Sequence, residues 1–399
     1  MMDAGRHPNI ELLSYSEVVE VHGYVGNFQV KVKGKARYVD LEKCTGCGDC
    51  MEACVWHDRV YSEYEAGMGL RSSIYIPFAQ AVPMKAVVDA DSCLLLTRGK
   101  CAQKCIQVCE ADAINFDQED EYMDITVGTV VLATGMDLTD DPLLARYGYG
   151  IYDNVIDGLQ FERLTSAAGP TEGKVVTRDG RVPETTVFLH CIASRDDDAH
   201  EYCSRICCMY GAKQAHLALE KTGGRVYQFY IDMRTAGKGY EEFYKRMQHE
   251  GIDYVRGKVA EVVADPDGSG KLLVRGEDTL LGRNVEIPAD LVVLLTAATP
   301  AAGSRETGRL FGVSVDKDGF FAEAHPKLKP VDTTTAGVFL AGCCQSPKDI
   351  PDTVAQASGA AARAMILLSQ GEVEIDPTVA EVIREKCSGC GECILACPY

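Results

Sequence analysis

The pattern of apolar and polar positions predicts a doubly wound α/β domain in the middle of the chain. Between 186 and 263, strand-like apolar runs alternate with helix-like segments in the order β, α, β, α, β. The strands are expected at 186–189, 226–232 and 254–263, and the second helix at 240–250. A turn rich in Asp, Pro and Gly at 264–271 is expected to join two antiparallel strands.

Further strand-like segments lie on both sides of this region. Residues 1–32 alternate between apolar and polar around a Val-Gly-Asn turn, which predicts a β-hairpin. A hairpin of this size is not stable alone, so we expect it to pack on a neighbouring sheet. Apolar runs at 125–138 and 289–300 predict buried strands, and 333–368 predicts a strand, a Gly-containing turn and a helix of small residues.

The turn after the first strand of the α/β domain has unusual chemistry. In dinucleotide-binding domains this turn carries a Gly-x-Gly-x-x-Gly motif, which lets the backbone approach a pyrophosphate. No such motif occurs anywhere in the chain, and the turn instead carries Cys191, Cys203, Cys207 and Cys208. We interpret it as an iron–sulfur site in the place of a nucleotide; the alternative is a set of buried free thiols.

Composition and charge narrow the class of protein. The chain has 399 residues, so two or three domains are expected. A net charge of −19 argues against nucleic acid or an anionic membrane surface as a partner. No apolar run is long enough to span a membrane, and the first residues lack the plan of a signal peptide, so we expect a cytoplasmic protein. In that compartment the 18 cysteines indicate metal ligands rather than disulfides.

Eight cysteines between 44 and 109 predict two four-iron clusters. The first four have the C-x2-C-x2-C-x3-C spacing of bacterial ferredoxins, in which the fourth cysteine of a run ligates the other cluster. The second four are spaced less regularly. A structural zinc site is the alternative, although zinc sites more often pair two C-x2-C motifs or include His. The two sets are Cys44, Cys47, Cys50 and Cys54, and Cys93, Cys101, Cys105 and Cys109.

A third cysteine run lies at the carboxyl end. It has full ferredoxin spacing and is followed by Pro398 and Tyr399, where the sequence stops. Because the fourth cysteine of such a run usually ligates a second cluster, three thiolates would lack their fourth partner here. We therefore expect that the chain is an internal part of a longer protein, with a truncated ferredoxin domain at 379–399. The cysteines are Cys387, Cys390, Cys393 and Cys397.

Two segments resemble the flavin-binding motifs of reductases with two dinucleotide-binding domains. The run at 125–138 contains an Ala-Thr-Gly, which such reductases carry where the chain crosses back to the flavin domain, and 333–368 resembles their last flavin motif. The usual Gly-Asp of that motif is Gly-Cys here. Cys343 and Cys344 are expected to be packed thiols, with a redox-active vicinal disulfide as the alternative. The resemblance implies FAD contacts from Ala133, Thr134, Gly135, Gly342, Cys343, Ile350, Thr353 and Gln356.

Seven segments together resemble the A-type subunit of heterodisulfide reductase, which carries flavin and iron–sulfur clusters in methanogens and many anaerobic bacteria. The segments are HPNIELLSYSEVVEVHGYVGNF, KCTGCGDC, IYIPFAQAVP, YCSRICCMY, GKGYEEFY, AHPKLKPV and PKDIPDTVAQAS. The resemblance implies a thioredoxin-reductase-like FAD core with one ferredoxin domain inserted and another appended. The expected domains are the end of the flavin domain at 1–32, a two-cluster ferredoxin domain at 33–117, and the core at 118–378, with its cluster-bearing α/β domain at about 170–300.

The same resemblance implies flavin-based electron bifurcation. FAD would pass one electron to a disulfide-reducing partner and the other to ferredoxin, through clusters that each carry one electron. Implied partners are B-type and C-type subunits, an electron-donating hydrogenase, formate dehydrogenase or flavoprotein, and a second copy of the chain. Lys213 matches a lysine expected beside the flavin, where its charge would stabilise the reduced form. The alternative is a solvated surface lysine.

Two other functions remain open at this point. The first is an NAD(P)H-linked iron–sulfur flavoprotein that resembles the small subunit of glutamate synthase, against which the missing glycine motif argues. The second is a non-catalytic electron relay that holds clusters but no flavin. A flavin absorption spectrum would separate this relay from the oxidoreductase.

Overall fold

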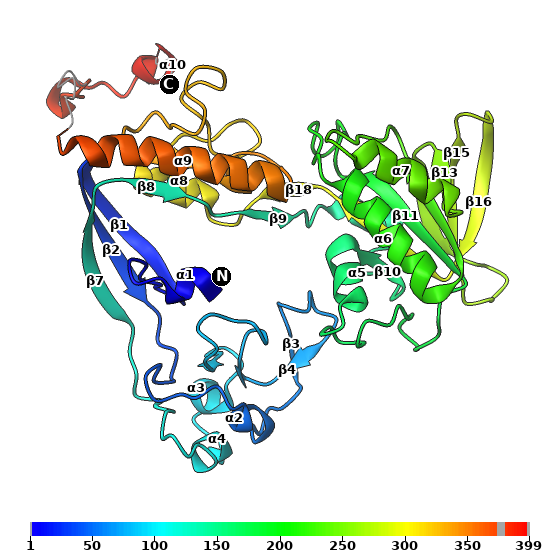
Figure 1. The fold of residues 1–399 in the computed structure, drawn as a ribbon, viewed down its shortest axis with the longest axis horizontal. Helices are drawn as coiled ribbons and strands as arrows, with labels where there is room; N and C mark the ends of the chain where they lie inside the picture. Colours follow the sequence, from blue (N-terminus) through cyan, green and yellow to red (C-terminus); the bar gives the residue numbers. More distant parts are fainter. Residues whose placement is uncertain (1, 373–379, 397–399) are drawn as a thin grey trace. The chain divides into compact units, whose positions relative to one another are not determined.

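A computed structural model describes residues 2–372 and 380–396 of the chain, which fold into two units (Figure 1). The first unit comprises 1–17, 33–123 and 138–298, and the second comprises 18–32, 124–137 and 299–399. The chain crosses between the units five times, and the last two crossings fall at β9 (Met136–Leu138) and β18 (Ala298–Pro300). The predicted α/β fold class is confirmed.

A five-stranded parallel sheet organises the larger part of the first unit. Its strand order is β10-β17-β11-β12-β13, and every neighbouring pair is parallel. Strand β17 has the run LVVLLT, which is apolar on both faces, as expected for a parallel strand covered on both sides. The strands are β10 (Val155–Asp157), β11 (Thr185–Ile192), β12 (Arg225–Tyr230), β13 (Asp253–Arg256) and β17 (Leu291–Thr296).

Alternate residues of these strands enter two separate cores. Phe188 and Val293 pack with three helices on one face, and Val187 and Val292 pack against a second sheet on the other. The helices are α5 (Gly158–Thr165), α6 (Cys207–Thr222) and α7 (Tyr240–His249). The second sheet is antiparallel, with β14 (Val259–Ala264), β15 (Leu272–Asp278) and β16 (Arg283–Ala289), and the 3-10 helix η1 (Pro142–Tyr147) lies beside it. The turn predicted at 264–271 is confirmed, and it joins the antiparallel strands β14 and β15.

One predicted strand is wrong. The run at 254–263 was expected to form a single strand, but it is divided into β13 and β14, which belong to different sheets. The break falls at Gly257, whose N–H donates to the carbonyl oxygen of Tyr230 at 2.8 Å. A Cβ atom there would lie 1.7 Å from the carbonyl oxygen of Glu277, so only glycine allows this close approach of two backbones. The α/β domain, which was expected to begin at about residue 170, begins earlier, because β10 belongs to its sheet.

The cysteine-rich part of the first unit has little regular structure. It contains two short antiparallel pairs, β3 (Val60–Tyr61) with β4 (Leu70–Arg71), and β5 (Ile74–Tyr75) with β6 (Val87–Val88). Its helices are α2 (Asp49–Glu52), α3 (Leu94–Arg98) and α4 (Lys104–Gln107), and α1 (Met2–Arg6) lies at the amino end. Val39, Ile74 and Val88 form a small core with several of the cysteines, so the thiols are part of the packing.

The second unit carries the hairpin that the sequence predicted. Strands β1 (Ser16–Tyr24) and β2 (Asn27–Gly34) flank the turn, and β7 (Glu121–Val127) completes the sheet in the order β1-β2-β7. A parallel pair, β8 (Val130–Leu132) and β19 (Val338–Leu340), leads through η2 (Gly342–Cys344) to the long helix α9 (Ile350–Gln370). Other elements are α8 (Ser304–Phe311), η3 (Arg384–Lys386) and α10 (Glu392–Ala396).

Helix α9 packs through its smallest side chains. Ala360 and Ala364 are buried against Val331 and Phe339, which brings the helix close to β19. Within the described ranges, no helix has the length and apolar character needed to cross a bilayer.

Candidate metal centres and flavin site

Four thiols of the cysteine-rich region line one cavity. They are Cys44, Cys47 and Cys50 from the first run, and Cys109, the last cysteine of the second set. Gly46 and Gly48 form part of the same wall with positive φ angles of 73° and 92°, so the backbone curls around the cavity. A backbone N–H, that of Ala113, donates to the Cys109 sulfur at 3.4 Å.

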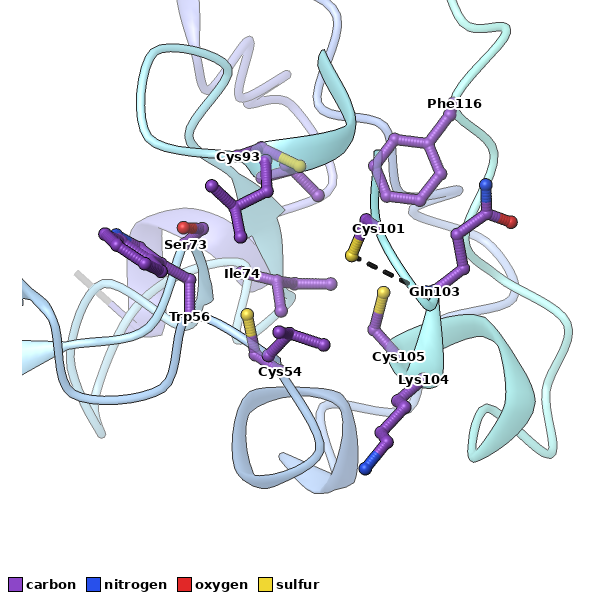
Figure 2. A pocket seen from close by; sticks show the side chains of 13 residues that line it. Cys54, Trp56, Ser73, Ile74, Cys93, Cys101, Gln103, Lys104, Cys105 and Phe116 are labelled. Carbon is purple, nitrogen blue, oxygen red and sulfur yellow. Dashed lines mark hydrogen bonds between the residues drawn. The ribbon is translucent and has the colours of Figure 1, made fainter. Parts of the chain in front are cut away.

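A second cavity is lined by the other four thiols. Figure 2 shows Cys93, Cys101 and Cys105 around one space with Cys54, the last cysteine of the first run. Trp56, Ile74 and Phe116 supply apolar walls, and the N–H of Gln103 donates to the Cys101 sulfur at 3.5 Å.

The two sequence runs therefore exchange their last cysteines. Each cavity takes three thiols from one run and the fourth from the other, as in two-cluster ferredoxins. Packing of α2 against α4 brings the two runs together. Burial raises the pKa of Cys50 to about 12 and that of Cys105 to about 11. These thiols are protonated in the cluster-free chain and must lose protons when they bind iron.

The donor sets suit a multi-iron group better than one ion. Among the described residues, no three His, Cys, Asp or Glu side chains converge as the ligands of a single ion would. Zinc draws four ligands to within about 2.3 Å of one point. In a four-iron cluster each thiolate binds a different iron, so the thiols stand further apart around a larger space. Each cavity is lined by four cysteines drawn from the two runs, a donor set that fits a four-iron cluster.

The third cysteine group gathers at the carboxyl end of β11. Cys191 lies within the strand, Cys203 in the following loop, and Cys207 and Cys208 in the first turn of α6. Burial is the main cause that raises the pKa of Cys207, and the nearby Cys191, Cys208 and Cys203 raise it further. The four thiols therefore lie near one another, and their binding of one cluster stays a prediction.

The loop between β11 and α6 is held in an uncommon conformation. Cys191, Ala193 and Arg195 all have φ angles between 55° and 59°, a region that non-glycine residues rarely occupy. The side chain of Ser194 donates to the Tyr202 carbonyl oxygen at 2.8 Å, and the Arg195 N–H donates to the same oxygen at 3.0 Å. These bonds fold the loop back towards the strand that carries the first thiol.

The acidic residue after β12, Asp232, already binds two arginine side chains. In NAD-binding domains a carboxylate near this position binds the ribose hydroxyls. Here Asp232 accepts hydrogen bonds from Arg195 at 2.8 Å and from Arg256 at 3.3 Å. The backbone oxygen of Asp232 also lies 3.8 Å from the Cys208 sulfur. At this site the chain offers neither the glycine motif nor a free carboxylate to NAD(P)H, which weakens the glutamate synthase alternative.

The predicted flavin residues meet at the ends of β8 and β19. The Ala341 N–H donates to the Leu132 oxygen at 2.9 Å, which places Ala133, Thr134 and Gly135 beside the turn at Gly342. Gly342 adopts a φ of 82°, and its N–H donates to Gln356 Oε1 at 2.7 Å. Ala133 and Thr134 are exposed, and Thr353 packs next to Gly342.

A buried lysine holds this turn from the other side. Lys348 Nζ donates to the carbonyl oxygens of Gly342 and Ser346, both at 2.7 Å, and only 7% of the residue is exposed. Cys344 is buried and lies 3.2 Å from the Leu132 oxygen, as expected for a packed thiol. Cys343 is only partly buried, unlike the packed thiol expected there, and its sulfur lies 3.5 Å from the Lys348 oxygen, while Ile350 is exposed. The glycine turn before the amino terminus of α9 has the order of elements expected of a flavin nucleotide site.

The structure places Lys213 in an ion pair on the helical face of the sheet. It lies on α6 with about half of its side chain exposed, and it pairs with Glu162 of α5 at 2.6 Å. Its role beside a flavin stays a prediction. At the carboxyl end, Cys387, Cys390 and Cys393 are exposed, and Cys397 lies outside the described residues.

Sequence reasoning missed Arg195 and Lys348. Arg195 stands in an Asp-rich loop, where a single cation resembles an ordinary surface charge. Lys348 precedes a helix, where lysine is common. Their partners are visible only in the folded chain.

A family model described as a 4Fe-4S binding domain matches residues 380–399, which confirms the predicted ferredoxin run at the carboxyl end. Curated relatives match the whole chain. The A-type subunit of the H(2):CoB-CoM heterodisulfide,ferredoxin reductase of Methanothermobacter thermautotrophicus is 49% identical over 403 residues, and the A-type iron-sulfur subunit of the CoB–CoM heterodisulfide reductase of Methanocaldococcus jannaschii is 45% identical. The chain spans 60% of the length of both.

A more distant relative is the A-type subunit of the ferredoxin:CoB-CoM heterodisulfide reductase of Methanosarcina mazei, which is 41% identical over 403 residues. The match covers the whole of this chain and 50% of that protein. Among solved structures, thioredoxin reductase of T. acidophilum aligns with 84% of this chain and 96% of its own. The TM-score is 0.38 and the sequence identity 14%.

Proposed function

Over its whole length the chain is homologous to A-type subunits of heterodisulfide reductases, and we propose that it forms the iron–sulfur and flavin electron-transfer region of such a protein. The three cysteine groups in the described residues would each bind a four-iron cluster, and the run at 387–397 would contribute to a fourth. The turn at Gly342 would hold FAD.

One observation carries this proposal. The two cysteine runs between 44 and 109 exchange their fourth thiols between two separate cavities. That exchange is a property of two-cluster ferredoxins, where it fixes both clusters in one small domain. Free thiols that only fill the core would not be expected to line two separate cavities in sets of four.

The bound groups would supply one-electron and two-electron chemistry, since clusters carry single electrons and flavins exchange either number. The chain's own residues would set the surroundings. Trp56, Ile74 and Phe116 would keep water from the cluster of the second cavity. Gln356 and Lys348 would hold the Gly342 backbone in the conformation that faces the flavin.

The finer proposal is flavin-based bifurcation. The name of the Methanothermobacter relative joins hydrogen, the CoB–CoM heterodisulfide and ferredoxin in one reaction, which supports a flavin that divides an electron pair between two acceptors. Disulfide cleavage would belong to B-type and C-type partner subunits. A hydrogenase, formate dehydrogenase or flavoprotein would donate the electrons, and the complex would contain two copies of the chain.

The experiment is to reconstitute the chain without oxygen and measure iron, sulfide and flavin per chain. Cys207→Ala is measured in parallel, because Cys207 belongs to the group that no ordinary ferredoxin has. We expect about twelve or more irons in the native chain and about four fewer in the variant. Eight irons, unchanged by the variant, would contradict a cluster at β11 and with it the bifurcation proposal. Clusters without bound flavin would favour an electron relay.

A further inference from the structure

We infer that Arg195 is a positioning and tuning residue for the cluster at Cys191, Cys203, Cys207 and Cys208: its guanidinium donates to a sulfur of that cluster and raises its reduction potential. The inference rests on the proposed cluster and deepens it. It concerns which side chain decides how readily this site accepts an electron.

The first observation is an unpaired donor beside the thiols. The Nη1 atom of Arg195 is buried and has no hydrogen-bond partner among the residues that the structure describes. A buried N–H without an acceptor carries the full cost of its lost hydration, so native structures rarely leave one unless a bound group satisfies it. The sulfurs of an iron–sulfur cluster are acceptors of that kind.

The second observation is the direction of the guanidinium. Its other terminal nitrogen, Nη2, donates to Asp232 Oδ2 at 2.8 Å, and only 19% of the side chain is exposed. The backbone oxygen of the same Asp232 lies 3.8 Å from the Cys208 sulfur, and the Arg195 N–H donates to the oxygen of Tyr202, the neighbour of Cys203. The guanidinium is therefore anchored at one nitrogen in the part of the chain that carries the thiols.

The third observation is that Asp232 binds two arginines, Arg195 and Arg256. Its second oxygen accepts from Arg256 at 3.3 Å, and 44% of the Arg256 side chain is exposed. The two arginines thus carry the same charge and bind the same carboxylate, but Arg195 is the more buried of the two and has the buried Nη1 atom without a partner among the described residues. Arg256 is a natural control.

Reduction of the cluster adds one electron and therefore one negative charge, with no bond made and no proton moved. A nearby cation and an N–H donor both favour the more negative form, because net charge and hydrogen bonds to the sulfurs set cluster potentials. Removal of Arg195 should make the cluster harder to reduce. In a redox titration, dithionite supplies the electron.

The test compares the full chain with Arg195→Gln, Arg195→Lys and Arg256→Gln after anaerobic reconstitution. Iron and sulfide are counted first. The electron paramagnetic resonance signal of this cluster is identified as the one that Cys207→Ala loses, and its midpoint potential is found by redox titration. We expect Arg195→Gln to lower the potential by at least about 59 mV, a tenfold change in the one-electron equilibrium. Arg195→Lys should lie between this variant and the native chain, and Arg256→Gln should stay near the native value.

Three results would overturn the inference in different ways. If Arg195→Gln keeps its full iron content and shifts the potential no more than Arg256→Gln, Arg195 has no tuning role. If the native chain has no signal that Cys207→Ala removes, the cluster itself is absent and the proposed function fails as well. Should Arg195→Gln not assemble the cluster, Arg195→Lys decides: a potential equal to the native one would refute the role of the planar donor.

Discussion

The exchange of cysteines between the two ferredoxin runs gives a test that iron counting can decide. Cys50 and Cys54 belong to one run, yet they line different cavities. Cys105 comes from the other run and shares a cavity with Cys54. We therefore expect Cys50→Ala/Cys54→Ala to damage two clusters, and Cys54→Ala/Cys105→Ala to damage only one.

The magnitude follows from four irons in each cavity. Each single variant should lose about four irons per chain, because a cluster with a missing thiolate is not held. The Cys50→Ala/Cys54→Ala pair should lose about eight. The Cys54→Ala/Cys105→Ala pair should lose no more than about four, since both changes act on one cluster and their effects are not additive. Iron and acid-labile sulfide are measured after anaerobic reconstitution.

If each run bound one cluster with its own four cysteines, the pattern of iron loss would be the opposite. Under that arrangement Cys50→Ala/Cys54→Ala would lose about four irons, and Cys54→Ala/Cys105→Ala about eight. Either of these values would refute the exchange. Cys344→Ala is the control, because Cys344 is a buried thiol of the second unit that lines neither cavity. It should lose none of these irons.

Three further predictions concern the backbone, an ion pair and the flavin turn. Gly257→Ala would bring a Cβ atom to 1.7 Å from the Glu277 carbonyl oxygen, so it should destabilise β13 and β14 by about 1–3 kcal/mol, measured as faster amide exchange in those strands. Lys258 pairs with Asp196, and this hydrogen bond is the main cause that lowers the pKa of Asp196. That pair stabilises the fold above the unfolded pKa of Asp, about 4, and the contribution is lost as the pH falls through the lower folded value. Lys258→Met should therefore destabilise the cluster-free chain by up to about 1 kcal/mol at neutral pH, with a deficit that shrinks below about pH 4 in urea unfolding. Lys348→Met removes the buried donor of the Gly342 turn and should weaken FAD binding about tenfold, as expected for one lost charge-assisted hydrogen bond, measured by flavin fluorescence.

Each of these three predictions can be contradicted by a specific result, and two of them have a matched control variant. Gly359→Ala, in α9, would meet nothing closer than 3.8 Å and should be neutral or stabilising; equal effects of both alanines would contradict the clash. A Lys258→Met deficit that does not change with pH would mean that the pair contributes only packing. Lys327→Met removes an exposed lysine of the same unit, and an equal loss of FAD in that variant would show that the turn is not held by Lys348.

The sequence by itself determined the element types and the chemical class of the sites. Apolar runs such as LVVLLT predicted buried strands, and the alternation around Gly26 predicted a hairpin. Cysteine spacing indicated iron–sulfur ligands, because close thiols on a short turn can surround one cluster. These properties depend on residues near each other in the chain, where spacing fixes geometry.

Only the tertiary structure decided which distant groups meet. Packing of α2 on α4 pairs Cys54 with Cys105 and not with Cys50. The approach of the Gly257 and Glu277 backbones divides one strand-like run between two sheets, and Glu277 lies outside that run. Asp232, which follows a different strand, holds one nitrogen of Arg195 in the loop between Cys191 and Cys203. Local propensity is a property of short segments, whereas these contacts arise from the order in which strands and helices pack.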